Sequence, residues 1–457
     1  MRPTLVRYQI LVATFLVALF MYVDRACLGQ VTTDIQRELH LADWQMDWVK
    51  GAFFFSYALA QVFSAAVAVR YGLRHTFAAC LFLWSAFTVL TGLSGGFVVL
   101  VASRLLVGIT EAGAYPIAAS LVRNWFPLNA RGFASSMVAL GGRIGGAVSL
   151  YLTPILVVAF AAYPKEVHGA IAGGPAMTAY DPATSGWRQT LALFGLLGMG
   201  YAVVYWFVAR DRAADHPRAN AAEAALVPPS PPKAAEPFPL VPILLSRPLW
   251  FASLTQCCVN IGWAFIITSL GDYLEKGHGL TGEEKGKWAS LPMWASIGGM
   301  FVGGFLTDYL TRRLGLRWGR GLPVGAALLV CAAACGVAAN TADYKLVVTM
   351  LCVMAAFVDV GTPAIWAFAQ DVGGRHTGAA LGWANMWGNL GAGLSPVLLG
   401  AVQRGFAVEG VPTSGWPAAF AVCTVTFVIA AASALGLNAS RPLTKSVAPT
   451  SPSPGSS

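Results

Sequence analysis

Charged residues are scarce in this sequence. Asp, Glu, Lys and Arg make up 11% of its 457 residues, whereas soluble domains carry about 25%. Hydrophobic residues make up 56%, and apolar runs of near-spanning length recur from one end to the other. These runs are too long for the strands of a transmembrane barrel. The composition therefore excludes an ordinary soluble domain and predicts an all-α membrane protein embedded in the lipid bilayer.

The sequence also lacks the motifs of several functional classes. It has no Gly-rich phosphate loop ending in Lys-Ser or Lys-Thr, which argues against ATP-driven transport. It has no His-Glu-x-x-His, no cluster with metal-ligand spacing and no basic face with interleaved aromatic residues. None of the six histidines lies in the core of a predicted span, so an embedded hydrolase would lack a histidine base. We expect no enzyme, no cofactor, no metal and no nucleic-acid partner.

Cysteine is present only inside the apolar runs. None of the eight cysteines falls in a loop where an oxidising compartment would pair it. We interpret them as small buried hydrophobic residues rather than metal ligands or disulfides.

The apolar runs predict twelve transmembrane helices in two pseudo-symmetric six-helix bundles. The first run has no small-residue cleavage site and is followed by further spans, so we expect it to remain as a span. The predicted spans are 9–29, 46–69, 76–94, 96–122, 132–160, 187–209, 247–274, 287–311, 321–340, 345–370, 377–402 and 416–438.

The chain divides near its middle. We predict an N-terminal bundle over 1–210, a cytoplasmic linker over 211–245, a C-terminal bundle over 246–440 and a disordered cytoplasmic tail over 441–457. A Pro-rich run within the linker should stiffen it, and the loop 161–186, rich in Gly, Ala and Pro, should lie on the outer side.

The two halves share a weak internal repeat. A carboxylate, a glycine and a proline recur in spans four and ten, which is typical of a duplicated transporter. Chance matching of Gly and Pro in apolar helices is the alternative. The matched segments are Glu111-Ala-Gly113 with Pro116, Asp359-Val-Gly361 with Pro363, Thr153-Pro154, and Ser395-Pro396.

The distribution of charge predicts the orientation. With the N-terminus placed inside, the inner segments hold 18 Lys/Arg and 6 Asp/Glu, whereas the outer segments hold 9 and 12. An excess of Lys and Arg marks the cytoplasmic side. We therefore expect a multi-pass protein of the inner membrane with both termini in the cytoplasm.

Four charges stand in two apolar spans: Asp24 and Arg25 in the first, Arg104 and Glu111 in the fourth. A charge at the bilayer centre costs about 2.5–3.5 kcal/mol and usually marks a substrate or ion path. Arg104 and Glu111 are nearly two turns apart and point to one side, and we expect Asp24 within reach of Arg104. The cluster is either a static ion-pair network or a pair of protonatable carboxylates tuned by arginines.

Arg143 lies too deep in span five to reach the membrane surface easily. Its planar fork suits an anionic ligand. The alternative is an ion pair with Glu111 or another internal acid. Asp359 occupies the place that mirrors Glu111, which makes it a further candidate for proton coupling.

Neutral polar and aromatic side chains line the spans of both halves. As a set they suit a hydroxylated substrate, although each alone is more readily explained as a contact between helices. They are Tyr22, Tyr57, Gln61, Gln256, Asn260, Trp366, Asn385 and Asn389.

Together, several motifs resemble the anion:cation symporters of the major facilitator superfamily, which include galactonate, hexuronate, glucarate and phthalate transporters of bacteria and the sialin-type carriers of animals. The resemblance covers nearly the whole chain. The motifs are Tyr22-Val-Asp24-Arg25, Ala58–Gln61, Arg104-x6-Glu111, Asn124-Trp-Phe-Pro127 with Arg131-Gly132, Gly186-Trp-Arg188, Arg210-Asp-Arg212 with His216-Pro217, Gln256-Cys-Cys-Val-Asn260, and Asn385-Met-Trp-Gly-Asn389.

The resemblance implies proton-coupled uptake of a small organic anion by alternating access, which we expect from a monomer. Asp24 and Glu111 match the coupling carboxylates of the family, and Arg25 and Arg104 match the arginines beside them. Tyr57, Gln256 and Asn385 fall where such proteins contact sugar acids.

Two positions depart from the family pattern. Val69 replaces the acidic residue expected between spans two and three, whereas Asp308 keeps it in the second half; the latch of the first half should therefore be weak. Arg143 stands where a neutral amide is common, which favours a dianionic or more acidic substrate.

Other functions stay open at this stage. An exporter or exchanger on the same fold would show counterflow that does not depend on pH. A non-transporting membrane sensor would bind ligand tightly without flux. A membrane enzyme is the weakest alternative.

Overall fold

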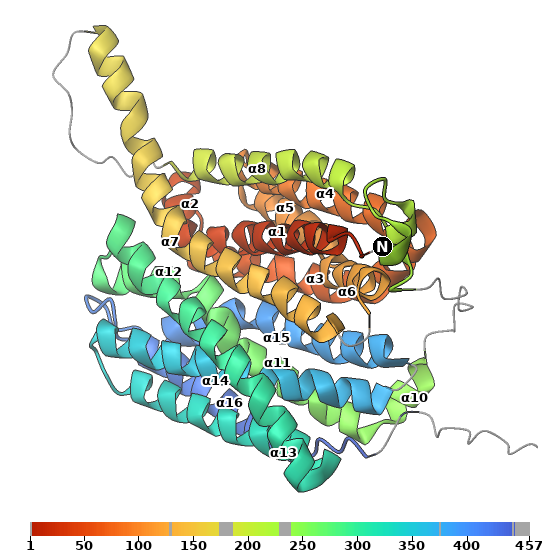
Figure 1. Ribbon diagram of the computed structural model, residues 1–457. Coiled ribbons are helices and arrows are strands. Elements are labelled where there is room, and N and C mark those ends of the chain that lie inside the picture. The colour runs from red at the N-terminus through yellow and green to blue at the C-terminus, as the bar shows by residue number, and fades with distance from the viewer. Residues whose placement is uncertain are drawn as a thin grey trace, which may run out of the picture.

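The structure is a computed structural model that describes residues 2–127, 130–172, 186–227, 239–373, 376–440 and 443. Within these ranges the chain is almost entirely helical, and the only β-type pairing is an isolated bridge between Val408 and Val411. The predicted all-α membrane fold is confirmed. Its helices form two adjacent groups, one from each half of the chain (Figure 1).

The first group contains the helices up to residue 208. They are α1 (Val6–Ala26), η1 (Cys27–Gln30), α2 (Thr32–Leu39), α3 (Asp43–Tyr71), α4 (Leu73–Gly92), α5 (Phe97–Glu111), α6 (Ala114–Trp125), α7 (Arg131–Ala172) and α8 (Trp187–Val208). Within this group α1 packs on α7, α3 on α5 and α4 on α8.

The second group follows the linker, where η4 (Ala213–Asp215) and α9 (Ala221–Ala224) are short. Within it α13 packs on α14 and α16, and α11 packs on α15. Its elements are α10 (Leu240–Leu245), α11 (Arg247–Thr268), α12 (Leu270–Asp272), the π-helix η5 (Tyr273–Gly277), α13 (Gly282–Ala339), α14 (Tyr344–Gly373), α15 (Thr377–Gly405) and α16 (Trp416–Ala434).

Ten helical stretches of the described chain are long and apolar enough to cross a membrane. The helices α3 and α15, each of 29 residues, correspond to the two remaining predicted spans and are long enough to cross a membrane. They pack against each other at the interface between the halves. Some of their polar residues bond to the opposite half, as Asn385 does to Gln61 and Arg404 to Asp47, and polar groups in spans usually face such an interior.

The structure adds detail to two predicted spans and corrects the start of one predicted loop. The fourth span is two helices, α5 and α6, separated at Ala112 and Gly113. Spans eight and nine both lie within α13 and are separated, between their predicted ends, at the non-helical Gly315, whose φ is 74°. Glycine adopts this positive φ without strain, and it makes the turn. The outer loop predicted from 161 begins later, because α7 continues through an alanine-containing stretch to Ala172.

The linker is not uniformly irregular, because part of it is clamped to the start of α1. The Glu223 carboxylate accepts hydrogen bonds from the backbone nitrogens of Val6 (3.2 Å) and Arg7 (2.9 Å) and from the Thr4 hydroxyl. It thereby caps the first turn of α1, whose amides have no partner within their own helix. The Asn220 side chain caps α9 in the same segment.

Some predictions lie outside the described residues. These are most of the Pro-rich run of the linker, the outer loop from 173 to 185, and nearly all of the tail. Within the tail only Leu443 is described, and its backbone nitrogen donates to the Val372 carbonyl at 2.9 Å.

The halves meet where α3 packs on α15 and α7 packs on α13. We name the two ends of the bundle: the linker side carries the chain N-terminus, η4, α9 and α10, and the far side carries α2, α12 and η5 (Figure 1). Glycines permit backbone contact between the halves. A Cβ atom added at Gly51 would lie 2.7 Å from the Gly393 carbonyl oxygen, and one at Gly271 would lie 2.5 Å from that of Gly29.

Candidate functional site

The first charged cluster joins α1 to the end of α5. The Arg25 guanidinium forms an ion pair with the Glu111 carboxylate, and its Nε donates to Glu111 Oε1 at 2.9 Å. Glu111 is fully buried, and its Oε2 has no hydrogen-bond partner among the described residues. The pair is therefore held through a single carboxylate oxygen.

Aromatic rings surround the Arg25 guanidinium. Its Cζ lies 4.9 Å from the ring centroids of Tyr22 and Phe53 and 5.0 Å from that of Tyr57. Rings at this distance attract a cation through their electron-rich faces. The predicted residues Tyr22 and Tyr57 thus lie at the same site as Arg25.

Asp24 points to a different neighbour. It is fully buried, and its Oδ2 accepts a hydrogen bond from the Ser85 hydroxyl of α4 at 3.0 Å. Within the described chain, Oδ1 of Asp24 has no hydrogen-bond partner. Adjacent residues on a helix point about 100° apart, so Asp24 and Arg25 reach different helices.

Arg104 lies near Asp24, and no direct ion pair between the two is found among the described residues. It is buried, with its Cζ 5.1 Å from the Phe53 ring. No ion pair to an acid is found for Arg104 in the described ranges. It interacts electrostatically with both Asp24 and Glu111, and so adds positive potential to the cluster without being neutralised by one partner.

The second charged cluster crosses between the halves. Arg143 Nη2 of α7 donates to Asp359 Oδ1 of α14 at 2.6 Å. The Arg143 Cζ also lies 4.4 Å from the ring centroid of Trp263 on α11. The alternative we left open, a pair with an internal acid, is the one observed, and the acid is Asp359 rather than Glu111.

The predicted neutral residues have mixed surroundings. Asn385 Nδ2 donates to Gln61 Oε1 at 3.0 Å, which joins α15 to α3 across the halves. Asn260 and Asn389 donate to the carbonyls of Gln256 and Asn385, four residues earlier on their own helices. Their amide groups are therefore partly occupied by local bonds.

Solvent exposure shows which side of the bundle leads to the second cluster. On α7, Ser136 and Gly132 are exposed; they lie seven and eleven residues from Arg143 toward the linker side. Leu150 and Pro154 are buried; they lie equally far from Arg143 toward the far side. These positions share one face of the helix.

The same asymmetry holds on α14. Trp366 is 38% exposed and Gln370 is exposed, seven and eleven residues from Asp359 toward the linker side. On the same face toward the far side, Ala355 and Val348 are buried and Cys352 is half-buried. The interface between the halves is therefore accessible from the linker side and closed toward the far side. Trp366 accordingly lies on the same helix face as Asp359.

A network of charges closes the far side, and sequence reasoning missed it. Lys50 of α3 pairs with Asp272 at 2.5 Å, and Arg404 of α15 pairs with Asp47 of α3 at 2.5 Å. Both pairs join one half to the other. The signal was present as acidic and basic residues near the ends of spans, but such residues usually face the membrane surface.

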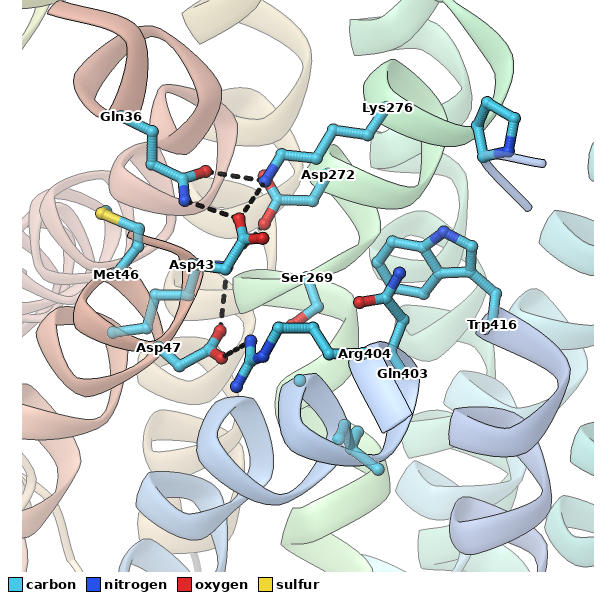
Figure 2. A pocket seen from close by; sticks show the side chains of 14 residues that line it. Gln36, Asp43, Met46, Asp47, Ser269, Asp272, Lys276, Gln403, Arg404 and Trp416 are labelled. Atoms are coloured by element: carbon cyan, nitrogen blue, oxygen red, sulfur yellow. Dashed lines mark hydrogen bonds and ion pairs between the residues drawn. The ribbon is translucent and has the colours of Figure 1, made fainter. Parts of the chain in front are cut away.

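Lys276 adds a third connection to this network. Its Nζ bonds to Asp43 at 3.1 Å and to Gln36 Oε1 at 2.7 Å. Figure 2 shows Lys276 beside Gln36 and Asp43, with Arg404 beside Asp47. A cavity of about 90 Å³ lies among these side chains.

On the linker side, Asp211 contacts the chain just after the loop in which Val69 replaces the expected acidic residue. Its carboxylate accepts from the backbone nitrogens of Leu73 (3.1 Å) and Arg74 (2.7 Å), at the start of α4. A carboxylate from the end of α8 thus caps the helix that follows this loop.

Two helical halves with buried opposite charges at their interface define the class of secondary transporters. The Major Facilitator Superfamily model matches residues 14–396. The chain belongs to this superfamily, as its motifs predicted, and is a multi-pass membrane transporter rather than an enzyme.

Known proteins of similar sequence are transporters. The probable sulfoacetate transporter SauU of Cupriavidus necator is 27% identical, with 86% of each chain covered. The probable galactarate/D-glucarate transporter GudP of Bacillus subtilis is 26% identical, covering 88% of this chain and 86% of that one. A bacterial homolog of the human lysosomal transporter Spinster, solved in an inward-facing and unoccupied conformation, has a similar fold, with a TM-score of 0.75 at 21% identity over 94% of this chain and 97% of that one.

Proposed function

We propose that this transporter carries a small organic anion, a sugar acid or similar carboxylate, together with protons in the same direction. The observation that carries the proposal is the Arg25–Glu111 pair inside its aromatic surroundings. A buried guanidinium held by one carboxylate is a site at which an anion and a proton can exchange. The names of the similar transporters, which mention sulfoacetate and sugar acids, support an organic anion.

The proposed coupling follows from the charges. While Glu111 is ionised, it neutralises Arg25 and competes with an incoming anion. When Glu111 takes up a proton, the guanidinium is freed to bind the substrate carboxylate with two hydrogen bonds. Asp24, with one oxygen unpartnered in the described chain, is the second coupling carboxylate, which takes up this proton and passes it on to Glu111. Arg104 keeps the potential at both acids positive.

The neutral residues supply the remaining contacts in this proposal. Tyr22, Tyr57 and Gln256 would bond substrate hydroxyl groups from the two halves. Asn385 would do so by exchanging its bond to Gln61. Asn260, Asn389 and Trp366 were predicted as contacts too. Local bonds occupy the amides of the two asparagines, and Trp366 is 38% exposed, so we retain all three as secondary candidates.

The proposed cycle is alternating access. Access from the linker side, with the far side closed by ion pairs, corresponds to one end state. The excess of Lys and Arg in linker-side segments supports a cytoplasmic location for that side. We propose that the protein resides in the inner membrane with both termini in the cytoplasm and works as a monomer.

The test uses purified protein in proteoliposomes. Thermal-shift screening against sugar acids, dicarboxylates and aromatic acids first selects a ligand, since binding to the folded state raises the melting temperature. Wild-type protein should then concentrate that ligand when a proton gradient is imposed. Glu111→Gln and Asp24→Asn should lose concentrative uptake, whereas Glu409→Gln, in an exposed loop, should keep it.

Two outcomes would contradict the proposal. Concentration of substrate by the Glu111→Gln or Asp24→Asn variant under a proton gradient would remove the coupling role of that carboxylate. Counterflow by the wild type with no response to pH would instead identify an exchanger.

A further inference from the structure

The Arg143–Asp359 pair differs in position from the Arg25–Glu111 pair. The latter lies within the first half, whereas Arg143 and Asp359 belong to opposite halves. An ion pair between halves that move relative to each other must change its partners, or its length, during a transport cycle. Its chemistry therefore bears on what the transporter carries.

The pair is only half satisfied. Arg143 uses Nη2 for Asp359, while Nη1 has no hydrogen-bond partner in the part of the chain that the structure describes. Oδ2 of Asp359 is likewise without a partner there. A guanidinium can hold a carboxylate through two parallel bonds, so an incoming anion in the fork geometry would bind Arg143 through more bonds than Asp359 does.

The surroundings of the pair favour exchange on the linker side. The faces of α7 and α14 that carry it are exposed toward that side. Trp263 lies over the guanidinium and would continue to stabilise the cation after Asp359 leaves. The other ionisable groups that interact with the pair are the Cys331 thiol of α13 and the phenols of Tyr22 and Tyr115, from α1 and α6.

The phenols also connect the two clusters. Tyr22 lies against the Arg25 guanidinium and interacts electrostatically with Arg143. A Cβ atom added at Gly142, the residue before Arg143, would lie 2.8 Å from the Tyr22 ring. A single small ligand near Tyr22 would therefore lie close to both arginines.

We propose that Arg143 and Asp359 form a second anion-exchange unit and that the substrate carries two anionic groups. One group binds Arg25, the other displaces Asp359 from Arg143, and Asp359 takes up a proton as it is displaced. This inference rests on the proposed function, because it extends the same exchange of carboxylate for substrate to the second half. It makes Arg143 the residue that selects dianions over monoanions.

The charges of the two clusters support this division of roles. Asp24, Glu111 and Asp359 balance Arg25, Arg104 and Arg143, so their formal sum is zero. A dianion would leave two excess negative charges in a buried site, which is costly unless they are compensated. Protonation of Glu111 and Asp359 restores the balance, which predicts two protons taken up per dianion and one per monoanion.

The test compares galactarate with D-galactonate, two probes with the same hydroxyl pattern. They differ only in a terminal carboxylate that replaces a primary alcohol. Wild-type protein in detergent should bind galactarate more tightly. Arg143→Gln should weaken galactarate binding by about tenfold to a hundredfold, the range for loss of one charged hydrogen-bonded contact, and leave D-galactonate within about threefold. Asp359→Asn, which removes the competing charge, should strengthen galactarate binding.

Proton uptake gives a second and independent readout. Calorimetry in buffers of different ionisation enthalpy should give two protons per galactarate bound to the wild type and one for Asp359→Asn. D-galactonate should give one proton with the wild type. Arg143→Lys keeps the charge without the fork and should retain part of the preference, which guards against a folding defect in Arg143→Gln.

The proposal is overturned if Arg143→Gln weakens both ligands equally, or if Asp359→Asn leaves the proton number for galactarate unchanged. In either case binding and uptake of one proton per ligand would persist, and the proposed function would stand. If neither ligand is bound with proton uptake and none from the wider acid screen is transported, the proposed function fails and the second exchange unit fails with it.

Discussion

Lys50 of α3 and Asp272 at the end of α12 form a buried ion pair 2.5 Å long that joins the two halves on the far side. Lys50 also lies 4.0 Å from Asp47, which pairs with Arg404. The Lys50 ammonium is therefore close to an acid of each half, Asp47 and Asp272. Its loss would leave these two buried carboxylates on either side of the interface without the cation between them.

Replacing Lys50 by methionine should open the far side. Breaking a buried pair costs about 3–5 kcal/mol because the remaining charge is uncompensated. This cost falls on the arrangement in which the far side is closed, so the free energy of opening that side decreases. Hydrogen exchange of segments 30–45 and 269–280 should become faster. Lys287→Met, at an exposed position of α13, is the matched control, and equal exchange in the two variants would contradict the role assigned to Lys50.

Adding one methyl group at Gly51 should destabilise the closed interface. The added Cβ would lie 2.7 Å from the Gly393 carbonyl oxygen, and overpacking costs about 1–3 kcal/mol. The gain from replacing a helical glycine by alanine is about 1 kcal/mol, so the steric cost prevails. At Gly304, where a Cβ would meet nothing within 4 Å, only the gain remains.

The measurement for this pair is thermal unfolding in detergent. Gly51→Ala should melt below the wild type and Gly304→Ala at or above it. A melting temperature of Gly51→Ala above that of the wild type would contradict the predicted steric clash, because it would mean that α3 and α15 accommodate the methyl group without loss of stability.

Removing the Glu223 carboxylate should loosen the start of α1. Glu223→Ala leaves the amides of Val6 and Arg7 without their acceptor, and loss of a helix cap costs about 0.5–2 kcal/mol. Limited proteolysis should cut residues 213–226 and the first residues of the chain faster. Asp215→Ala, an exposed acid in the same segment, should leave the cleavage rate unchanged.

The stability of the linker should depend on pH through His216. Burial, together with the nearby Arg210 and Arg218, lowers the pKa of His216 below its usual value of about 6.5. Its neutral ring packs edge-on against Trp125. The folded state therefore disfavours the proton, so this contribution is present above about pH 6.5 and is lost as the pH falls below it.

The check is a comparison of melting temperatures for the wild type and His216→Gln. The wild type should exceed the variant by more at pH 7.5 than at pH 5.5. A difference that stays constant or widens on acidification would contradict the direction of the pKa shift.

The charged cluster was predictable because Asp24, Arg25, Arg104 and Glu111 interrupt apolar runs in which charge is costly. The choice of partners was not predictable. Which arginine meets Glu111 depends on the rotation of α1 against α5, and sequence spacing fixes only the relative directions within one helix. The break between α5 and α6 directly after Glu111 falls at Gly113, just before Pro116, two residues that the internal repeat had marked.

The pairing of Arg143 with Asp359 depends on a register between helices more than 200 residues apart in sequence. The internal repeat gave Asp359 a position in the second half equivalent to that of Glu111 in the first. It could not show that the partner of Asp359 would come from the other half. The far-side network was missed for a related reason. Residues such as Lys50 and Asp272 stand near span ends, where charge usually needs no partner but water.

The clamp of Glu223 on the start of α1 has a consequence for how the chain is made. The helix is synthesised first, yet the acid that caps it follows more than 200 residues later. During translation the first six spans are inserted before their opening turn is capped, and that end of the bundle is completed only when the linker leaves the ribosome. A chain divided between its halves would keep this clamp only if the break falls beyond Ala225.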